Sequence, residues 1–189
     1  MKRLVFFAGL FLACCSAIAQ QFEKGTTALN VGLGVGGILD DYYYYGNSSP
    51  VFSASIEKGL WDIAGPGVIS LGGYLGFQTH RDDDYYSYYS SERWRHTVIG
   101  VRGNYHYNGF TNIPQLDLYA GTMIAYNAVR YTYVDSQGRR TKANSQYRAG
   151  GVRLTAYAGG RWFFNEKFAG FVELGYGITA LNFGGTLKF

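Results

Sequence analysis

KFAGFVELGYGITALNFGGTLKF, residues 167–189, consists of two alternating segments on either side of a short break. In the second segment, Phe183, Leu187 and Phe189 fall on one face of an extended chain, and Asn182 falls on the opposite face with other small or polar residues. The first segment alternates in the same way. The stretch therefore predicts a β-hairpin that is apolar on one side and polar on the other.

Six further segments show the same period of two. They are residues 27–35, 52–58, 68–79, 95–107, 115–126 and 152–163. With the terminal hairpin they make about eight strands, each close to the length that a tilted strand needs to cross a membrane. The composition, with 27 Gly, 18 Tyr and 13 Phe against 3 Pro, is typical of a membrane barrel or another all-β domain.

The connections between these segments alternate in length. Long polar connections cover residues 40–50, 80–93 and 134–148, and short ones cover 59–67, 108–114 and 165–167. A barrel with both termini in the periplasm places its long connections on the outer side of the membrane and its tight turns on the periplasmic side. The order predicts an all-β fold, an antiparallel eight-stranded up-and-down transmembrane β-barrel, because a soluble sandwich has no reason to keep this alternation.

An export signal precedes the predicted barrel. Residues 1–19 begin with Lys2 and Arg3, continue with an apolar run that is too short to span a bilayer permanently, and end on Ala19. We expect a signal peptide over residues 1–19, cleaved after Ala19, and an outer-membrane β-barrel over residues 20–189.

Both cysteines, Cys14 and Cys15, lie in the predicted leader, so the mature chain would have no thiol chemistry. Lipidation of Cys14 is the alternative to cleavage after Ala19. Without Lys2 and Arg3 the 17 basic residues fall to 15, against 13 acidic ones, a net charge of +2. This charge is too small to indicate nucleic acid as a partner.

The leader, the strand pattern, the loop lengths and the terminal Phe together resemble the small eight-stranded outer-membrane barrels of the OmpA-transmembrane, OmpX and opacity-protein type. The phrases DLYAG at 117–121 and GGRWFF at 159–164 are similar to segments of those barrels. The resemblance implies a location in the cell outer membrane. It also implies that Phe183, Leu187 and Phe189 form the signal that the barrel-assembly machinery recognises.

Charged residues occur at positions that face the predicted barrel interior. They are Glu57, Arg102, Asp117, Arg153, Arg161, Glu173 and Lys188. The interior of such a narrow barrel is filled by side chains, so these charges must pair or be hydrated. We interpret them as a lumen charge network that acts as a structural plug. A gated ion path is the alternative.

The sequence predicts no metal site, no cofactor and no catalytic residue. His96 and His106 share strand parity but are ten positions apart, and His80 lies in a predicted loop, so the three histidines would be hydrogen-bonded or solvated. No segment combines a nucleophile with a base in the way that an enzyme of the outer leaflet would need. An enzyme is therefore not expected.

Tyrosines and arginines concentrate in the predicted outward connections. The candidate surface-binding residues are Tyr42, Tyr43, Tyr44, Tyr45, Tyr85, Tyr86, Tyr88, Tyr89, Arg139 and Arg140. The tyrosines offer stiff contact surface for an extracellular partner, or they form an interfacial aromatic girdle. Arg139 and Arg140, with Arg93, Arg95 and Lys142, could pair with lipopolysaccharide phosphates or be a solvated face.

The function we predict is therefore a structural or adhesin-like role through the outward loops. A small ion or solute channel is the first alternative, and an outer-leaflet lipid-modifying enzyme is the second.

Overall fold

The computed structural model describes residues 22–36, 47–63, 65–84, 90–134, 139–142 and 150–189. These residues form ten strands: β1 (Thr27–Val35), β2 (Asn47–Ser48), β3 (Val51–Ile63), β4 (Gly67–Asp84), β5 (Ser90–Tyr107), β6 (Leu116–Val134), β7 (Arg140–Lys142), β8 (Gly151–Phe163), β9 (Phe168–Tyr176) and β10 (Leu181–Lys188). Within the described ranges, no helix has the length and hydropathy to cross a bilayer.

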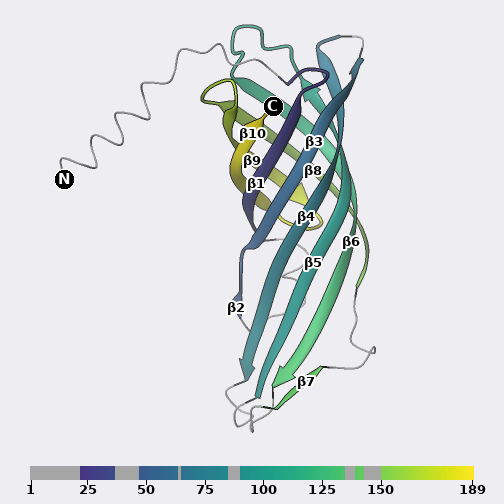
Figure 1. Cartoon of the computed structure of the whole chain (residues 1–189), viewed down its shortest axis with the longest axis vertical. Coiled ribbons are helices and arrows are strands. Elements are labelled where there is room, and N and C mark those ends of the chain that lie inside the picture. Colours follow the sequence, from purple (N-terminus) through teal and green to yellow (C-terminus); the bar gives the residue numbers. More distant parts are fainter. Residues whose placement is uncertain (1–21, 37–46, 64, 85–89, 135–138, 143–149) are drawn as a thin grey trace, which may run out of the picture.

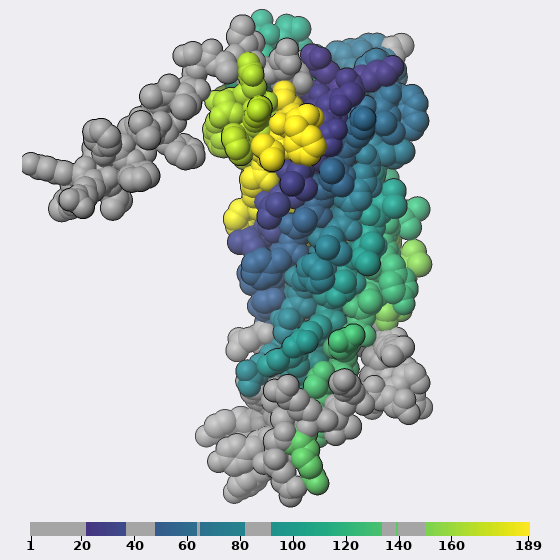
Figure 2. Space-filling model, in the orientation of Figure 1, coloured from purple at the N-terminus to yellow at the C-terminus, as the bar shows by residue number. Residues whose placement is uncertain are grey.

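Eight of the strands close into a barrel, as the sequence predicts. Each of β1, β3, β4, β5, β6, β8, β9 and β10 pairs antiparallel with the next, and β1 pairs with β10 from Ala28↔Lys188 to Val35↔Leu181. The short strands β2 and β7 add to β4 and β6. Closure leaves every barrel strand paired on both sides, which is the condition for backbone polar groups in a lipid environment. Figure 2 shows β10, in yellow, against β1, in purple.

The barrel is apolar outside and polar inside. Along each barrel strand buried and exposed residues alternate, as the sequence predicts. Large apolar side chains point outward, with Val152 73% and Ile124 62% exposed, whereas the interior holds Glu57, Asp117 and other polar residues with almost no exposed surface. This arrangement is the inverse of a soluble protein's, where large apolar side chains collect inside.

The two ends of the barrel differ. At the end where β1 begins and β10 ends, which we call the terminal end, short connections join β3 to β4, β5 to β6 and β8 to β9. At the opposite end, the far end, β4, β5 and β6 reach well beyond the other five barrel strands (Figure 1). We call residues 79–84, 90–95 and 130–134 of these strands the extension.

The extension corrects the predicted boundaries. Residues 80–93 were expected to form a loop, but β4 continues to Asp84 and β5 starts at Ser90, with Arg81 paired to Arg93. The physical reason is that backbone pairing continues where charged residues replace the apolar ones on which the period-two signal depends. The first short connection, expected at 59–67, likewise narrows because β3 runs to Ile63.

Candidate functional site

Four charged side chains form a closed ring inside the terminal half of the barrel. The Arg161 guanidinium donates to Asp117 Oδ2 at 3.0 Å and to Glu57 Oε1. His106 Nδ1 lies 2.9 Å from Asp117 Oδ1, and His106 Nε2 lies 3.3 Å from Glu57 Oε2. The side chains of all four residues have no exposed surface. They come from β8, β6, β3 and β5, so the ring ties four strands of the barrel together across its interior.

The contacts of His106 assign its protonation. The Ser70 hydroxyl donates to Glu57 Oε2 at 2.8 Å, so its oxygen can accept from His106 Nε2 at 3.0 Å. His106 Nδ1 faces the Asp117 carboxylate, which only accepts. Both ring nitrogens therefore donate, which makes His106 an imidazolium. The two positive charges of the ring then match its two carboxylates.

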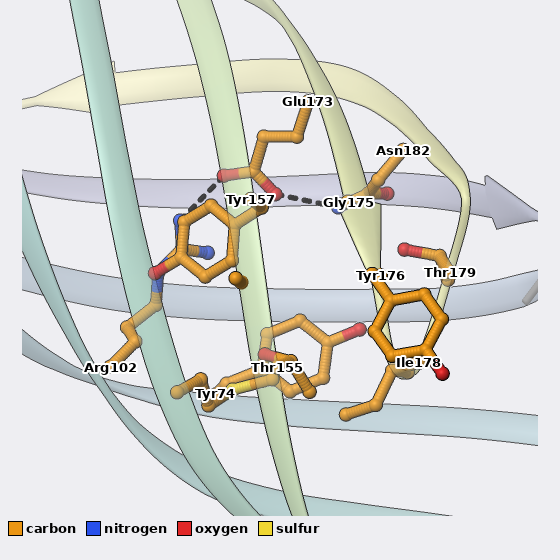
Figure 3. A pocket seen from close by; sticks show the side chains of 12 residues that line it. Tyr74, Arg102, Thr155, Tyr157, Glu173, Gly175, Tyr176, Ile178, Thr179 and Asn182 are labelled. Atoms are coloured by element: carbon orange, nitrogen blue, oxygen red, sulfur yellow. Dashed lines mark hydrogen bonds and ion pairs between the residues drawn. The ribbon is translucent and has the colours of Figure 1, made fainter. Parts of the chain in front are cut away.

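A second ion pair lies nearer the far end. Arg102 Nη2 donates to Glu173 Oε1 at 2.5 Å, and the Tyr119 hydroxyl donates to the same oxygen at 2.9 Å. Asn182 Nδ2 lies 3.3 Å from the other oxygen of Glu173. The guanidinium of Arg102 also stacks on the Tyr157 ring, 4.4 Å from its centroid (Figure 3). The carboxylate of Glu173 is thus compensated by one cation and two neutral donors.

Neutral side chains join the two groups. Asn104 donates to Glu57 Oε2 and accepts from the Tyr157 hydroxyl at 2.5 Å, and the Arg161 guanidinium lies over the Tyr119 ring, 4.4 Å from its centroid. Asn30 lies 3.4 Å from Glu57 Oε1 and accepts from Thr186 at 2.7 Å. We call the whole set the interior network; it comprises Asn30, Ser55, Glu57, Ser70, Arg102, Asn104, His106, Asp117, Tyr119, Tyr157, Arg161, Glu173, Asn182 and Thr186. Every barrel strand contributes to it.

Apolar groups cover the interior network on both sides. At the terminal end, the Phe22 ring stacks on His106 with 3.9 Å between centroids, and the Phe22 carbonyl accepts from Asn108 at 2.9 Å. On the far side lies a buried apolar layer of Val51, Tyr74, Val98, Met123, Ala125 and Ile178. Ile178 reaches this layer from the β9–β10 connection, where Gly177 has a φ of 122°.

Little open space is left between the network and the apolar layer. A cavity lined by Arg102, Glu173, Tyr74 and Ile178, among others, has a volume of about 30 Å³ (Figure 3). That volume holds a water molecule or two. Among the described residues, the interior is therefore closely packed between the interior network and the apolar layer.

Two of the seven predicted lumen charges lie outside the interior network. Arg153 is exposed: it shares the inward parity of Thr155, but β8 begins at Gly151, so its side chain lies at the far-end opening. Lys188 lies near the terminal end of β10, partly buried, with its ammonium 4.9 Å from the centroid of the Phe163 ring. The network also includes His106. The sequence analysis did not predict it as part of the charge network, although His106 shares a strand face with Arg102.

Three network side chains have the order of a Ser–His–Asp triad. Ser70 Oγ contacts His106 Nε2, and His106 Nδ1 contacts Asp117. The hydroxyl hydrogen of Ser70 is directed to Glu57, however, and Ser70 has no exposed surface, so a substrate carbonyl has no approach to its oxygen. We interpret the arrangement as structural. Among the described residues, no group of His, Cys, Asp and Glu has the spacing to hold a metal ion.

The structure places the other predicted residues as follows. Phe183 and Phe189 are exposed on the outer face of the barrel, with Leu187 partly exposed between them. Arg139 is exposed, and Arg140 pairs with Val134 in the β6–β7 ladder. Tyr42, Tyr43, Tyr44, Tyr45, Tyr85, Tyr86, Tyr88 and Tyr89 lie outside the described residues, as do the predicted leader at 1–19 and Cys14.

Solved structures share this architecture. The N-terminal β-barrel domain of Pseudomonas aeruginosa OprF aligns with a TM-score of 0.52 and 13% identity, over 88% of this chain and 98% of that one. Ail, the attachment invasion locus protein of Yersinia pestis, in complex with the heparin analogue sucrose octasulfate, aligns with a TM-score of 0.53 and 8% identity, over 88% of this chain and 99% of that one.

No protein-family model matches the chain, and no curated protein matches its sequence. The likeness is thus one of fold. The closed antiparallel sheet, its inverted polarity and these two neighbours show that the chain has the fold of the small eight-stranded outer-membrane β-barrels.

Proposed function

We propose that this protein spans the outer membrane, with its terminal end in the periplasm, and that it serves a structural or surface-interaction role through its outward loops. The observation that carries the location is the belt of exposed apolar side chains around a closed barrel, which includes Val31, Ile99, Val101, Ile124, Leu154 and Leu174. Leaving a side chain of this size in water forgoes roughly 1.5–3 kcal/mol relative to burial. Lipid contact removes that cost for the whole belt.

The filled interior supports a role outside the lumen. The interior network reaches across the barrel. Phe22 covers it on one side, and the buried apolar layer that includes Ile178 covers it on the other. A wall that faces lipid and an interior that is full leave the outward connections as the place for specific recognition. Ail is the attachment invasion locus protein of Yersinia pestis, and a barrel of this fold with that name is consistent with an adhesin-like role.

The loop role is tested with tyrosine substitutions. One variant replaces Tyr42, Tyr43, Tyr44 and Tyr45 by Ser, and a second replaces Tyr85, Tyr86, Tyr88 and Tyr89 by Ser. Tyr105→Ser, on the apolar outer wall, is the matched control. Cells that display each variant are compared for attachment to epithelial cells and for phage sensitivity. We expect at least one loop variant to lose binding while the control keeps it.

Loop shortening provides a second comparison. Replacing residues 85–89 by Asn-Gly keeps the Asp84↔Ser90 pair at the end of the extension, and a shorter connection costs no more closure entropy. The barrel should therefore fold as before. If both tyrosine variants and the shortened barrel bind like the parent, the tyrosines are better explained as an interfacial girdle, and the loop role is refuted.

A small channel is the second candidate function, because the interior network is charged and ion pairs can exchange partners. Planar-bilayer recordings separate the two, since the filled barrel should show little steady conductance. Large, stable single-channel steps from the unaltered protein would favour the channel. A changed lipid A acyl pattern in cells that produce the protein would favour the third candidate, a lipid-modifying enzyme.

Export and assembly complete the proposal. The leader at 1–19 would direct the chain through the inner membrane, and β10, with Phe183, Leu187 and Phe189, would present the outward-facing signal to the barrel-assembly machinery. The contacts of the finished barrel would be outer-membrane lipid and lipopolysaccharide, with a possible extracellular partner at the loops.

A further inference from the structure

Four arginines gather on the outer face of the extension. Arg81 of β4 is paired with Arg93 of β5, and Arg95 of β5 is paired with Arg130 of β6. Their positions alternate with the inward-facing residues His80, Trp94 and His96. All four therefore share the outer face, which carries the apolar belt nearer the terminal end of the same strands. Arg81, Arg95 and Arg130 are exposed, and Arg93 is partly exposed.

Like charges stand directly opposite each other in this cluster. Opposed residues of an antiparallel pair have Cβ atoms only about 4.5–5.5 Å apart, and like charges in such positions are destabilising. Among the described residues, no carboxylate forms an ion pair with Arg93, Arg95 or Arg130. Arg93, Arg95 and Arg130 are therefore complementary to a ligand that brings closely spaced negative charges, and the Arg95–Arg130 pair is the centre of that surface.

The position of the cluster along the barrel axis indicates which molecule would supply the negative charges. Arg81, Arg95 and Arg130 each lie four residues beyond a large exposed apolar residue of the belt, namely Phe77, Ile99 and Tyr126. Four residues of strand rise about 13 Å, or about 10 Å along the barrel axis at the usual tilt. The polar headgroup layer begins at the edge of the hydrocarbon core. An arginine side chain at this height meets headgroups before it meets open solvent.

We propose that Arg81, Arg93, Arg95 and Arg130 form a binding site for the phosphate groups of an outer-leaflet glycolipid, that is, the bis-phosphorylated lipid A of lipopolysaccharide. Guanidinium groups bind phosphate through paired, charge-assisted hydrogen bonds, and the neighbouring apolar belt contacts the acyl chains of the same molecule. The site holds the extension against the membrane surface. This inference rests on the proposed outer-membrane location.

The test uses the full barrel, refolded in detergent and checked for heat-modifiable migration. Deep-rough lipopolysaccharide with both lipid A phosphates is titrated against the parent, and the same lipid after phosphatase treatment is titrated in parallel. The variant is Arg95→Gln with Arg130→Gln. The matched control is Arg153→Gln, another exposed arginine on a barrel strand that lies away from the cluster.

We expect the double variant to bind the phosphorylated lipid at least tenfold more weakly, the parent to bind the dephosphorylated lipid at least tenfold more weakly, and the control to match the parent. Replacement of both arginines by Lys should restore part of the affinity, because it keeps the charge. Binding should also weaken as salt is raised.

Equal binding of the two lipids, or equal binding by the parent and the double variant, would overturn the inference. Arginine-dependent binding of soluble heparin without arginine-dependent binding of the lipid would overturn it as well, because the site would then belong to a polysaccharide. These failures leave the proposed location standing if the protein still fractionates with the outer membrane. A soluble protein would refute the location itself.

Discussion

Removal of Arg102 isolates the energetic role of the interior network. Arg102 supplies the ion-pair partner of Glu173, whose carboxylate is otherwise held by the hydroxyl of Tyr119 and the amide of Asn182. Arg102→Met leaves a buried carboxylate with two neutral donors, and Glu173→Leu leaves a buried guanidinium stacked on Tyr157. Breaking a buried pair from one side costs about 3–5 kcal/mol. Each single variant should lose that much unfolding free energy.

The double variant should recover the part of the loss that comes from an unpaired buried charge, because replacing both partners of a buried pair by apolar groups of similar volume is often neutral or stabilising. The Tyr119 hydroxyl and the Asn182 amide then lack their acceptor, which costs about 1–3 kcal/mol each, so Arg102→Met with Glu173→Leu should lie about 2–6 kcal/mol below the parent. The sum of independent single losses would be about 6–10 kcal/mol. The difference between these values is the coupling energy that the structure predicts.

Urea unfolding of the refolded barrel, followed by tryptophan fluorescence and by heat-modifiable migration, measures these free energies. The control is the ion pair Lys24–Asp62, which spans 3.7 Å between side chains 59% and 63% exposed. Lys24→Met should change stability by less than about 1 kcal/mol, because exposed pairs contribute little. If the losses of Arg102→Met and Glu173→Leu add up in the double variant, the two side chains do not form the pair described, and the reasoning fails.

Three further changes test other parts of the fold. Gly184→Ala should prevent closure at the β1–β10 seam, because a Cβ there would lie 2.1 Å from the carbonyl oxygen of Val31. Gly73→Ala is the control, since a Cβ at Gly73 would have no atom within 4 Å, and this variant should fold normally. Heat-modifiable migration distinguishes the two variants. Phe22→Ala should lower the unfolding free energy by about 3 kcal/mol through loss of the ring buried against His106, and an unchanged urea midpoint would count against the terminal cover. Deletion of Phe189 should reduce the amount of folded barrel in cells but not refolding in detergent, and equal cellular amounts would remove the assembly signal from the account.

The barrel could be predicted from the sequence because one face of each strand had to be apolar. Val152 and Leu154 alternate with Arg153 and Thr155, and this period of two is visible without any long-range information. The eight-strand count and the strand parity were confirmed. The predicted C-terminal end of β4 and the predicted start of β5 were wrong, because Arg81 and Arg93 continue the hydrogen-bonded ladder beyond the apolar residues.

The interior network could be predicted only in part. Parity placed Glu57, Arg102, Asp117, Arg161 and Glu173 inside, but it gave no height along the barrel axis. Height depends on the stagger between strands, and stagger decides that Arg161 meets Glu57 and that Arg153 reaches the opening. The involvement of His106 follows from the same stagger, since its two nitrogens face carboxylates from two other strands.

The proposed outer-membrane barrel is tested most directly by fractionation of cells that produce the full chain. Each fraction is run on a gel before and after heating. A closed barrel with its apolar belt in lipid should appear in the outer-membrane fraction and should migrate differently when unheated, because the paired sheet resists detergent until it is heated. Recovery of the protein as soluble periplasmic material, with the same mobility before and after heating, would contradict the account.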